Sequence, residues 1–214
     1  MTEWLLRLAR ELAAPTLWLD VGATLARLLV GVSIATLAGW LLGLALGRSA
    51  KVWRWFEPLV DFGRAIPPVL AFPLCLVLFG YTETARVAAI VFGTTGIVLL
   101  HVASGLSRAP AARRDTARLA GLRGLTLVLR VDVFEALPSL FLGVRIALTA
   151  GLIISVVSEM LVGCEHGLGA RALDALISYR SDLLCLVIVL AGGTGFGLSA
   201  LLSALERRVV HWQA

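Results

Sequence analysis

Residues 115–138 read DTARLAGLRGLTLVLRVDVFEALP and form the longest run in this chain that is too polar to lie inside a bilayer. A strongly apolar segment flanks the run on each side. Two membrane spans can be joined by far fewer residues than this. We therefore expect the polar run to have a function of its own, and the segments around it to cross a membrane.

The composition outside this run is that of an integral membrane protein. Hydrophobic residues make up 59% of the chain and the mean hydropathy is +0.92, whereas soluble domains are roughly 45–50% apolar. Several apolar stretches approach or exceed the ~20 residues that a spanning helix needs. The sequence predicts one all-α transmembrane domain over residues 1–214, with the lipid bilayer as a partner. The net charge of +5 then marks loops and does not indicate nucleic acid binding.

Five spans are predicted, joined by polar segments. An amphipathic stretch over residues 2–14 is expected to lie on the membrane surface. Residues 48–64 are basic and rich in Trp, which is typical of a connector at the membrane boundary. Residues 163–181 are too polar to span and are expected to form a short helix at the outer surface. The spans are expected at about 20–47, 66–80, 86–106, 140–162 and 183–205, with a cytoplasmic segment at 107–138.

The first span contains a doubled G-x-x-x-G pattern, formed by Gly39, Gly43 and Gly47. Small residues at this spacing let a second helix backbone approach closely. The pattern alone favours two interpretations equally, packing within the chain and contact with another subunit.

The second predicted span is short and is interrupted by Pro67, Pro68 and Pro73. Proline removes a backbone donor and kinks a helix, and in lipid such a helix needs neighbours or a water-lined cavity to satisfy the freed carbonyls. These prolines indicate either a place beside a transport pathway or a simple packing kink. The fourth span carries Arg145 and Glu159, which lie about 21 Å apart along a helix; they cannot pair with each other and are candidate pathway or gating groups.

The distribution of cations predicts the orientation. With the N-terminus outside, twelve of the nineteen Lys and Arg residues fall in inside segments and five in outside segments. Cytoplasmic loops carry an excess of Lys and Arg. The sequence therefore predicts an outside N-terminus, a cytoplasmic C-terminus and a cytoplasmic location for residues 115–138.

Enzyme chemistry is not indicated by the motifs. The single lysine, Lys51, lies outside any G-x-x-x-x-G-K-[ST] frame, so ATP used by this protein would have to be hydrolysed on another chain. Cys164, Glu165 and His166 are adjacent but have no second ligand cluster, and no metal site is predicted.

The polar run resembles the cytoplasmic motif of ABC importer permeases, E-A-A, three residues, G, and nine residues later I-x-L-P. Asp115, Thr116 and Ala117 occupy the E-A-A places and Gly121 the glycine, with Asp115 in place of the usual Glu. Val131 and Val133 follow in the I and L places, and Phe134 stands where the motif has proline.

Three further stretches resemble the nitrate, sulfonate and taurine branch of these permeases, and the resemblance covers nearly the whole chain. They are GRAIPPVLAFPLCLVLFG (63–80), LPSLFLGVRIALTAGLIISVVSEML (137–161), and HGLGARALDA with the terminal LERRVVHW. Such permeases often carry a further N-terminal span, in whose place this chain has the amphipathic stretch. The resemblance implies a type I importer transmembrane domain of about five spans, in the bacterial inner membrane.

The resemblance also implies partners and roles. The chain would pair with a second permease, identical or not, and work with ABC ATPase subunits and a substrate-binding protein. It would bind no cofactor, since ATP and Mg²⁺ would sit on the ATPase. The solute would be small and anionic, such as nitrate, a sulfonate or taurine. The residues implied in coupling to the ATPase, within segment 115–134, are Asp115, Thr116, Ala117, Arg118, Gly121 and Leu122.

An alternative function from the residues alone is an ion-coupled carrier or channel that needs no ATPase. Its functional groups would be the charged or titratable residues within the spans, Arg27, His101, Arg145 and Glu159, because such residues are costly in lipid and commonly mark ion pathways.

Overall fold

The computed structural model describes residues 2–211, and the regular elements among them are all helical. Two short elements depart from α geometry, the 3₁₀ turn η1 and the π turn η2. The elements are α1 (Thr2–Ala13), α2 (Pro15–Gly47), α3 (Ala50–Ala65), η1 (Pro68–Leu70), α4 (Ala71–Phe79), α5 (Glu83–Ser107), α6 (Ala111–Leu119), α7 (Gly124–Leu127), η2 (Val128–Asp132), α8 (Val133–Val162), α9 (Leu168–Ile177) and α10 (Ser181–Val209).

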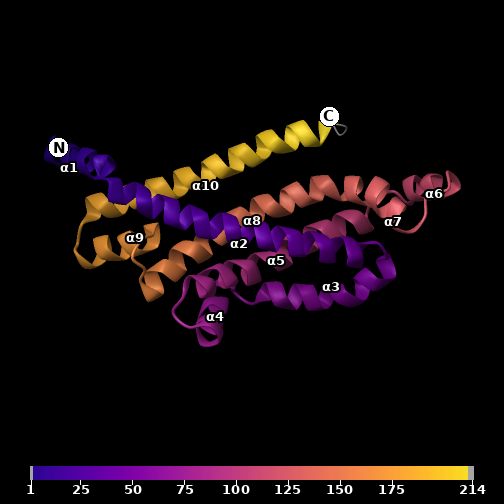
Figure 1. Cartoon of the computed structure of the whole chain (residues 1–214), viewed down its shortest axis with the longest axis horizontal. Helices are drawn as coiled ribbons and strands as arrows, with labels where there is room; N and C mark the ends of the chain where they lie inside the picture. The colour runs from indigo at the N-terminus through magenta and orange to yellow at the C-terminus, as the bar shows by residue number, and fades with distance from the viewer. Residues whose placement is uncertain (1, 212–214) are drawn as a thin grey trace.

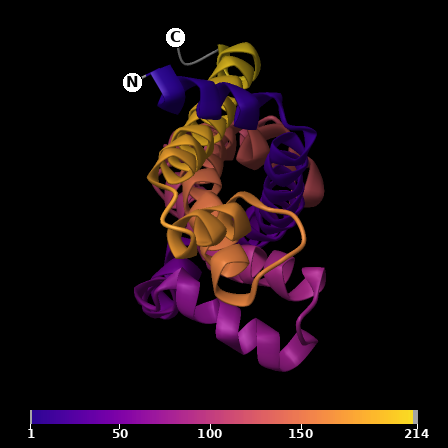
Figure 2. The ribbon, with the colours of Figure 1, turned by 90° about the vertical axis from the view of Figure 1, so that its left-hand side faces the viewer.

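The long helices run back and forth along the long axis of the molecule (Figure 1). Helices α6 and α7 form one end, which we call the α6 end, and α1 and α9 form the other, which we call the α9 end. Figure 2 looks onto the α9 end, where α9 lies across the bundle. The chain therefore alternates between two ends, as a multi-span membrane protein must.

Within residues 2–211, four helices are long and apolar enough to cross a membrane: α2, α5, the continuous helix Gly124–Val162, and α10. A fifth crossing is possible if Ala50–Gly63 and Pro68–Phe79 count as one span bent by 74°. One difference from the sequence prediction lies at the second span. The predicted span at 66–80 is only η1 and the nine-residue α4, and the predicted connector 48–64 is itself the helix α3.

The difference at α3 has a clear physical cause. Trp53 is buried and packs with Leu99 and Ala103 of α5, and Val60 joins the same cluster. Trp53 and Val60 are seven residues apart, so they lie on one face of a helix. The apolar stripe holds α3 against α5, although the exposed side of the helix carries the cations Lys51 and Arg54.

The core lies between α2, α5 and α8. Leu28 of α2, Ile90 and Val98 of α5 and Ile154 of α8 are among its buried side chains. A second apolar cluster at the α9 end joins α2, α9 and α10. Elsewhere many large apolar side chains are exposed, and Val77 and Phe196 are more than three-quarters exposed.

The three glycines of the first span lie against α5 of the same chain. A Cβ on Gly39 would come within 2.7 Å of the Val98 Cβ, and one on Gly43 within 2.7 Å of the Val102 Cβ. A Cβ on Gly47 would meet the Ala103 backbone at 2.7 Å. The G-x-x-x-G pattern therefore brings α2 and α5 together, as small residues do between membrane helices.

Candidate functional site

Helix α6 ends in a tight glycine turn. Gly121 has φ +85°, a conformation that costs a non-glycine residue roughly 1–2 kcal/mol. The Gly121 amide donates to the Arg118 carbonyl, and the Leu122 amide donates to the Ala117 carbonyl, each over 3.0 Å. This pair of bonds is the Schellman motif. The motif glycine is thus explained by the turn that closes α6.

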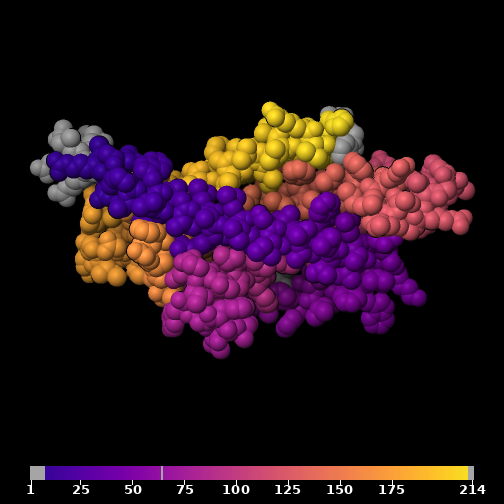
Figure 3. Space-filling model, viewed as in Figure 1, coloured from indigo at the N-terminus to yellow at the C-terminus, as the bar shows by residue number. Residues whose placement is uncertain are grey.

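The predicted coupling residues lie at the exposed tip of the α6 end (Figure 3). Asp115 and Arg118 form an exposed ion pair with an N–O distance of 3.3 Å. Leu119 is 90% exposed and Leu125 70% exposed. Large apolar side chains this exposed on a polar segment indicate a contact surface for another protein.

After the Gly121 turn, the predicted coupling segment leads into α8 as a continuous helix. The chain is helical from Gly124 to Val162, so residues 133–138, predicted to belong to the polar segment, are the first turns of α8. Phe134, in the place of the motif proline, lies inside this continuous helix. Since Phe keeps the backbone N–H that proline lacks, the helix carries on through this position.

Asp132 connects helix α6 to the bundle through ion pairs. This residue was not singled out from the sequence. Its carboxylate is almost fully buried and accepts a hydrogen bond from Arg114 Nε over 2.8 Å. Arg48 Nε lies 3.2 Å from the other carboxylate oxygen. The signal in the sequence was a charged residue between apolar neighbours at the start of a span, which does not by itself name its partners.

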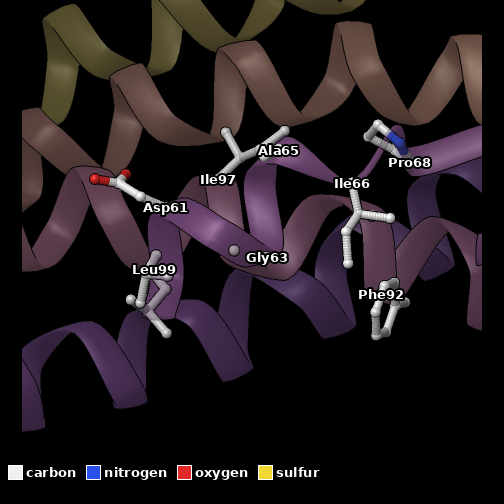
Figure 4. A pocket seen from close by; sticks show the side chains of 11 residues that line it. Asp61, Gly63, Ala65, Ile66, Pro68, Phe92, Ile97 and Leu99 are labelled. Carbon is white, nitrogen blue, oxygen red and sulfur yellow. The ribbon is translucent and has the colours of Figure 1, made fainter. Parts of the chain in front are cut away.

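The predicted pathway prolines interrupt the chain between α3 and α4. Pro67 and Pro68 begin η1, and Pro73 lies near the start of α4. A cavity of about 450 Å³ lies between this break and α5 (Figure 4). Pro68 lines it together with Phe92, and most of its wall is apolar.

The other two pathway candidates lie elsewhere and have separate partners. Arg145 Nη2 is 2.5 Å from a Glu206 carboxylate oxygen on α10. Glu159 is fully buried at the α9 end and pairs with Arg27 of α2, whose Nη1 lies 2.8 Å from Glu159 Oε1. Neither Arg145 nor Glu159 lines the cavity beside Pro68.

Glu159 is the centre of a buried polar cluster. Besides Arg27, it accepts hydrogen bonds from Thr24 Oγ1 and from the Gly169 amide, each over 2.9 Å. Arg27 also binds both carboxylate oxygens of Glu83. A Cβ on Gly169 would come within 2.1 Å of the Val156 carbonyl oxygen, so only glycine permits this approach. The cluster ties α2, α5, α8 and the start of α9 together.

A second polar network surrounds the loops at the α9 end. Asp20 accepts hydrogen bonds from the Gly167 amide (3.1 Å) and from Arg171 Nε (2.5 Å). Glu11 accepts from Arg180 Nη2 over 2.6 Å, and this hydrogen bond raises the pKa of Arg180. Burial raises the pKa of the Cys164 thiol in the same region.

The structure holds no group of three metal-ligating side chains among residues 2–211 that could bind an ion. Of the adjacent residues Cys164, Glu165 and His166, for which no metal site was predicted, His166 Nδ1 lies 3.2 Å from an Asp20 carboxylate oxygen, and Cys164 donates to the His166 carbonyl. His101 Nδ1 lies 2.8 Å from the Ile97 carbonyl oxygen one turn earlier in α5.

The helices and the exposed segment after α5 define the transmembrane subunit of a type I ABC importer. The chain matches a chain of the MetNI methionine ABC transporter, solved in inward-facing conformations, with a TM-score of 0.76 and 24% identity over 91% of this chain and 98% of that one. Residues 12–211 match the model of the binding-protein-dependent transport system inner membrane component family. The protein belongs to this family, as the sequence resemblance predicted.

Relatives of known or assigned activity cover most of the chain. The nitrate import permease protein NrtB of Leptolyngbya laminosa is 29% identical over 91% of this chain and 69% of its own length. The taurine transport system permease protein TauC of Escherichia coli is 28% identical over 92% and 71%. The bicarbonate transport system permease protein CmpB of Synechococcus elongatus is 27% identical over 88% and 68%.

Family membership establishes the coarse function. The protein is a multi-pass inner-membrane subunit of a transporter, not an enzyme. Permeases of this family bind no cofactor themselves, and ATP is bound on the partner ATPase. A binding protein and an ATPase are therefore partners of the system to which this chain belongs.

Proposed function

We propose that this chain forms one half of a translocation pathway that imports a small anionic solute, driven by a separate ATPase that docks on residues 115–134. The observation that carries the proposal is the exposed surface around Leu119 and Gly121, at the tip of a polar segment between two spans. The segment is helical, protrudes from one end of the bundle and runs directly into α8.

Docking would use residues 115–119, the second half of α6, and the turn that follows it. Gly121 gives a compact turn without a side chain, Leu122 and Leu119 offer apolar contact, and Asp115 and Arg118 form a polar rim, the usual anatomy of an interface. When ATP closes the two ATPase subunits, a docked helix would follow as a rigid body, and α8 would carry the movement into the membrane.

The relatives support an anionic solute. Their names assign nitrate, taurine and bicarbonate transport to permeases that match this chain over 88–92% of its length. Nitrate and bicarbonate are anions, and taurine carries an anionic sulfonate group. The cavity beside Pro68 is largely apolar and offers little chemistry to separate one small anion from another. We therefore infer that the binding protein selects among the anions.

The pathway would lie between this chain and a second permease, identical or homologous. The broken segment with Pro67, Pro68 and Pro73 would line it, together with α8 and α10, on which Arg145 and Glu206 form a pair. In the most apolar 18-residue stretch of α10, only 11% is buried within this chain. Such a surface fits contact with lipid and with a partner helix.

The proposed orientation has the α6 end in the cytoplasm. Most of the cations predicted to be cytoplasmic belong to segments at this end, including Arg48, Arg113 and Arg123. The α9 end, with α1, would face outside and be accessible to the binding protein. The N-terminus would then be outside and the C-terminus cytoplasmic.

The contacts of three of the four candidate residues do not favour the alternative function, an ion-coupled carrier or channel. Arg27 and Glu159 pair with each other, and Arg145 pairs with Glu206. These charges are accounted for by their mutual contacts, so a proton or ion relay is not needed to explain them.

Uptake by purified protein in proteoliposomes tests the proposal. The complex of this permease with its own ATPase is supplied with its binding protein and with labelled nitrate, taurine or bicarbonate. We expect uptake of at least one of these only when ATP and the binding protein are both present. Uptake by this chain alone, driven by an ion gradient, would instead establish the carrier.

A further inference from the structure

The polar core beneath α6 joins three separate parts of the chain. Asp132 Oδ1 accepts a hydrogen bond from Arg114 Nε (2.8 Å), and its Oδ2 lies 3.2 Å from Arg48 Nε. Arg114 Nη1 also donates to the Arg48 backbone carbonyl over 3.2 Å. Asp132 ends η2 at the entrance to α8, Arg114 belongs to α6, and Arg48 ends α2. One carboxylate thus links the exposed helix to two spans.

Helix α6 has few other means of attachment. None of its residues is buried, so it lacks an apolar face packed on the bundle. Its second link to α8 is the Arg113–Glu135 pair at 2.5 Å, in which the Arg113 side chain is 61% exposed. Exposed pairs contribute little because water and salt screen them. The buried contact with Asp132, whose side chain is 2% exposed, is therefore the stronger tether.

The π turn η2 changes the helical phase of the chain just before α8. A π turn holds one extra residue compared with an α turn, and one residue corresponds to a rotation of about 100° around a helix axis. The residues before η2 are therefore rotated relative to α8, whereas Asp132, directly before Val133, keeps the phase of α8. At this position its carboxylate reaches both arginines.

We propose that Asp132 is the positioning residue of the coupling segment: its buried carboxylate holds α6 at a fixed angle to α2 and α8, so that a movement of the docked ATPase reaches both spans together. This rests on the proposed function. Asp132 itself does not contact the ATPase. Its effect is exerted through Arg114 and Arg48.

The bundle does not depend on this contact for its fold. The core between α2, α5 and α8 is built from apolar side chains such as Leu28, Ile90 and Ile154. Loss of the Asp132 carboxylate should loosen α6 and leave this core intact. A positioning role and a role in general stability can therefore be separated by experiment.

The test compares three variants of the permease in lipid nanodiscs, with the purified ATPase of the same transporter as the binding probe. Asp132→Asn leaves two arginines without their carboxylate. The double variant Asp132→Asn with Arg114→Gln also removes the buried cation, which relieves the cost of an unpaired charge but does not restore the tether. Glu135→Gln is the matched control, since it breaks the exposed link between the same two elements.

We expect amides of 111–122 to exchange about tenfold faster or more in Asp132→Asn and in the double variant, while amides of α2 and α5 keep their wild-type protection. ATPase affinity should fall by about tenfold or more in both variants. The double variant should regain thermal stability without regaining affinity. Glu135→Gln should stay within about twofold of wild type in affinity, as expected for an exposed pair.

Two results would overturn the proposal. One is wild-type exchange at 111–122 and wild-type ATPase affinity in either Asp132 variant. The other is loss of α2 and α5 protection in both variants, which would make Asp132 a residue of the general fold. Failure of the wild-type permease to bind the ATPase at all would contradict the proposed function instead.

Discussion

Glu159 shows at the scale of one residue how this protein accommodates charge inside a span. It is fully buried and is bound by Arg27, Thr24, Ser155 and the Gly169 amide. A buried ion is tolerated when it is paired and its remaining lone pairs are satisfied. Glu159 therefore serves to hold the α9 end together, and any effect on transport would act through that structure.

Substitution Glu159→Gln should destabilise the fold strongly. Removing one partner of a buried ion pair typically costs roughly 3–5 kcal/mol. Arg27 loses the carboxylate 2.8 Å from its Nη1 but keeps its pair with Glu83, so we expect a cost at the lower end, about 3 kcal/mol. Glu206→Gln is the control, since it breaks the more exposed pair with Arg145 and should cost about 1 kcal/mol or less. Unfolding in mixed micelles would measure both, and equal losses would show that burial does not govern these pairs.

Cys164 gives a pH-dependent prediction. Burial, aided by the Glu159 carboxylate, raises the pKa of its thiol, and the thiolate is the reactive form. In a variant that keeps Cys164 and lacks the other two cysteines, maleimide labelling at neutral pH should be slower than that of a free thiol. The rate should rise as the pH increases above the range in which free thiols ionise. A labelling rate equal to that of free cysteine at pH 7 would contradict the burial of this group.

The ion pairs between residues far apart in the chain could not be predicted from the sequence. Arg27 and Glu159 are 132 residues apart, and each was recognised only as a charge within a span. Asp132 gave no pattern at all, because its partners come from a helix end and a separate helix. The position of Gly121 was predictable, because the motif places its glycine a fixed number of residues after Asp115, and that glycine forms the turn that ends α6.

At the scale of elements, the contact between α2 and α5 depends on small residues. The apolar runs predicted four of the long helices well, because a helix in lipid must be long and apolar along its whole length. The exception was α3, whose basic composition concealed the apolar stripe of Trp53 and Val60. The length of its neighbour α4 was overestimated. The sequence predicted one span over 66–80 because the apolar run is continuous there, but the prolines interrupt the helix and α4 covers only Ala71–Phe79.

Gly43→Ala tests the packing of α2 on α5. The new methyl group would come within 2.7 Å of Val102 and 3.0 Å of the Leu99 carbonyl oxygen, and such overpacking typically costs about 1–3 kcal/mol. Gly22→Ala, on the same helix, places its methyl group in open space and should be neutral or stabilising by up to about 1 kcal/mol. Denaturant unfolding of both variants separates a steric effect from a change in helix propensity; similar stabilities would contradict the close approach.

At the scale of the whole molecule, the fold has two functional ends. The α6 end carries the exposed segment on which we propose that the ATPase docks, and the α9 end carries polar networks that hold α9 to α2 and α8. The α9 end was anticipated only as a short surface helix, without the ion pairs that hold it. We expect this end to stay rigid while the α6 end transmits movement.

The orientation can be checked with two cysteines in a background without native cysteines. Ser178 lies at the end of α9 and Ala112 near the start of α6, and both are exposed. A membrane-impermeant maleimide should label the Ser178→Cys variant in intact cells and the Ala112→Cys variant only after lysis. The reverse pattern would place the α6 end outside and contradict the orientation given by the positive-inside rule.

The affinity of the ATPase for this permease tests the central claim most directly. In nanodiscs, Gly121→Arg should weaken binding by about tenfold or more, because it strains a left-handed backbone and puts a large cation on the docking surface. Ala112→Arg, a cation of equal size at an exposed position near the other end of α6, should leave the affinity within about twofold of wild type. Equal ATPase affinity in wild type and Gly121→Arg would show that the ATPase does not dock on this segment.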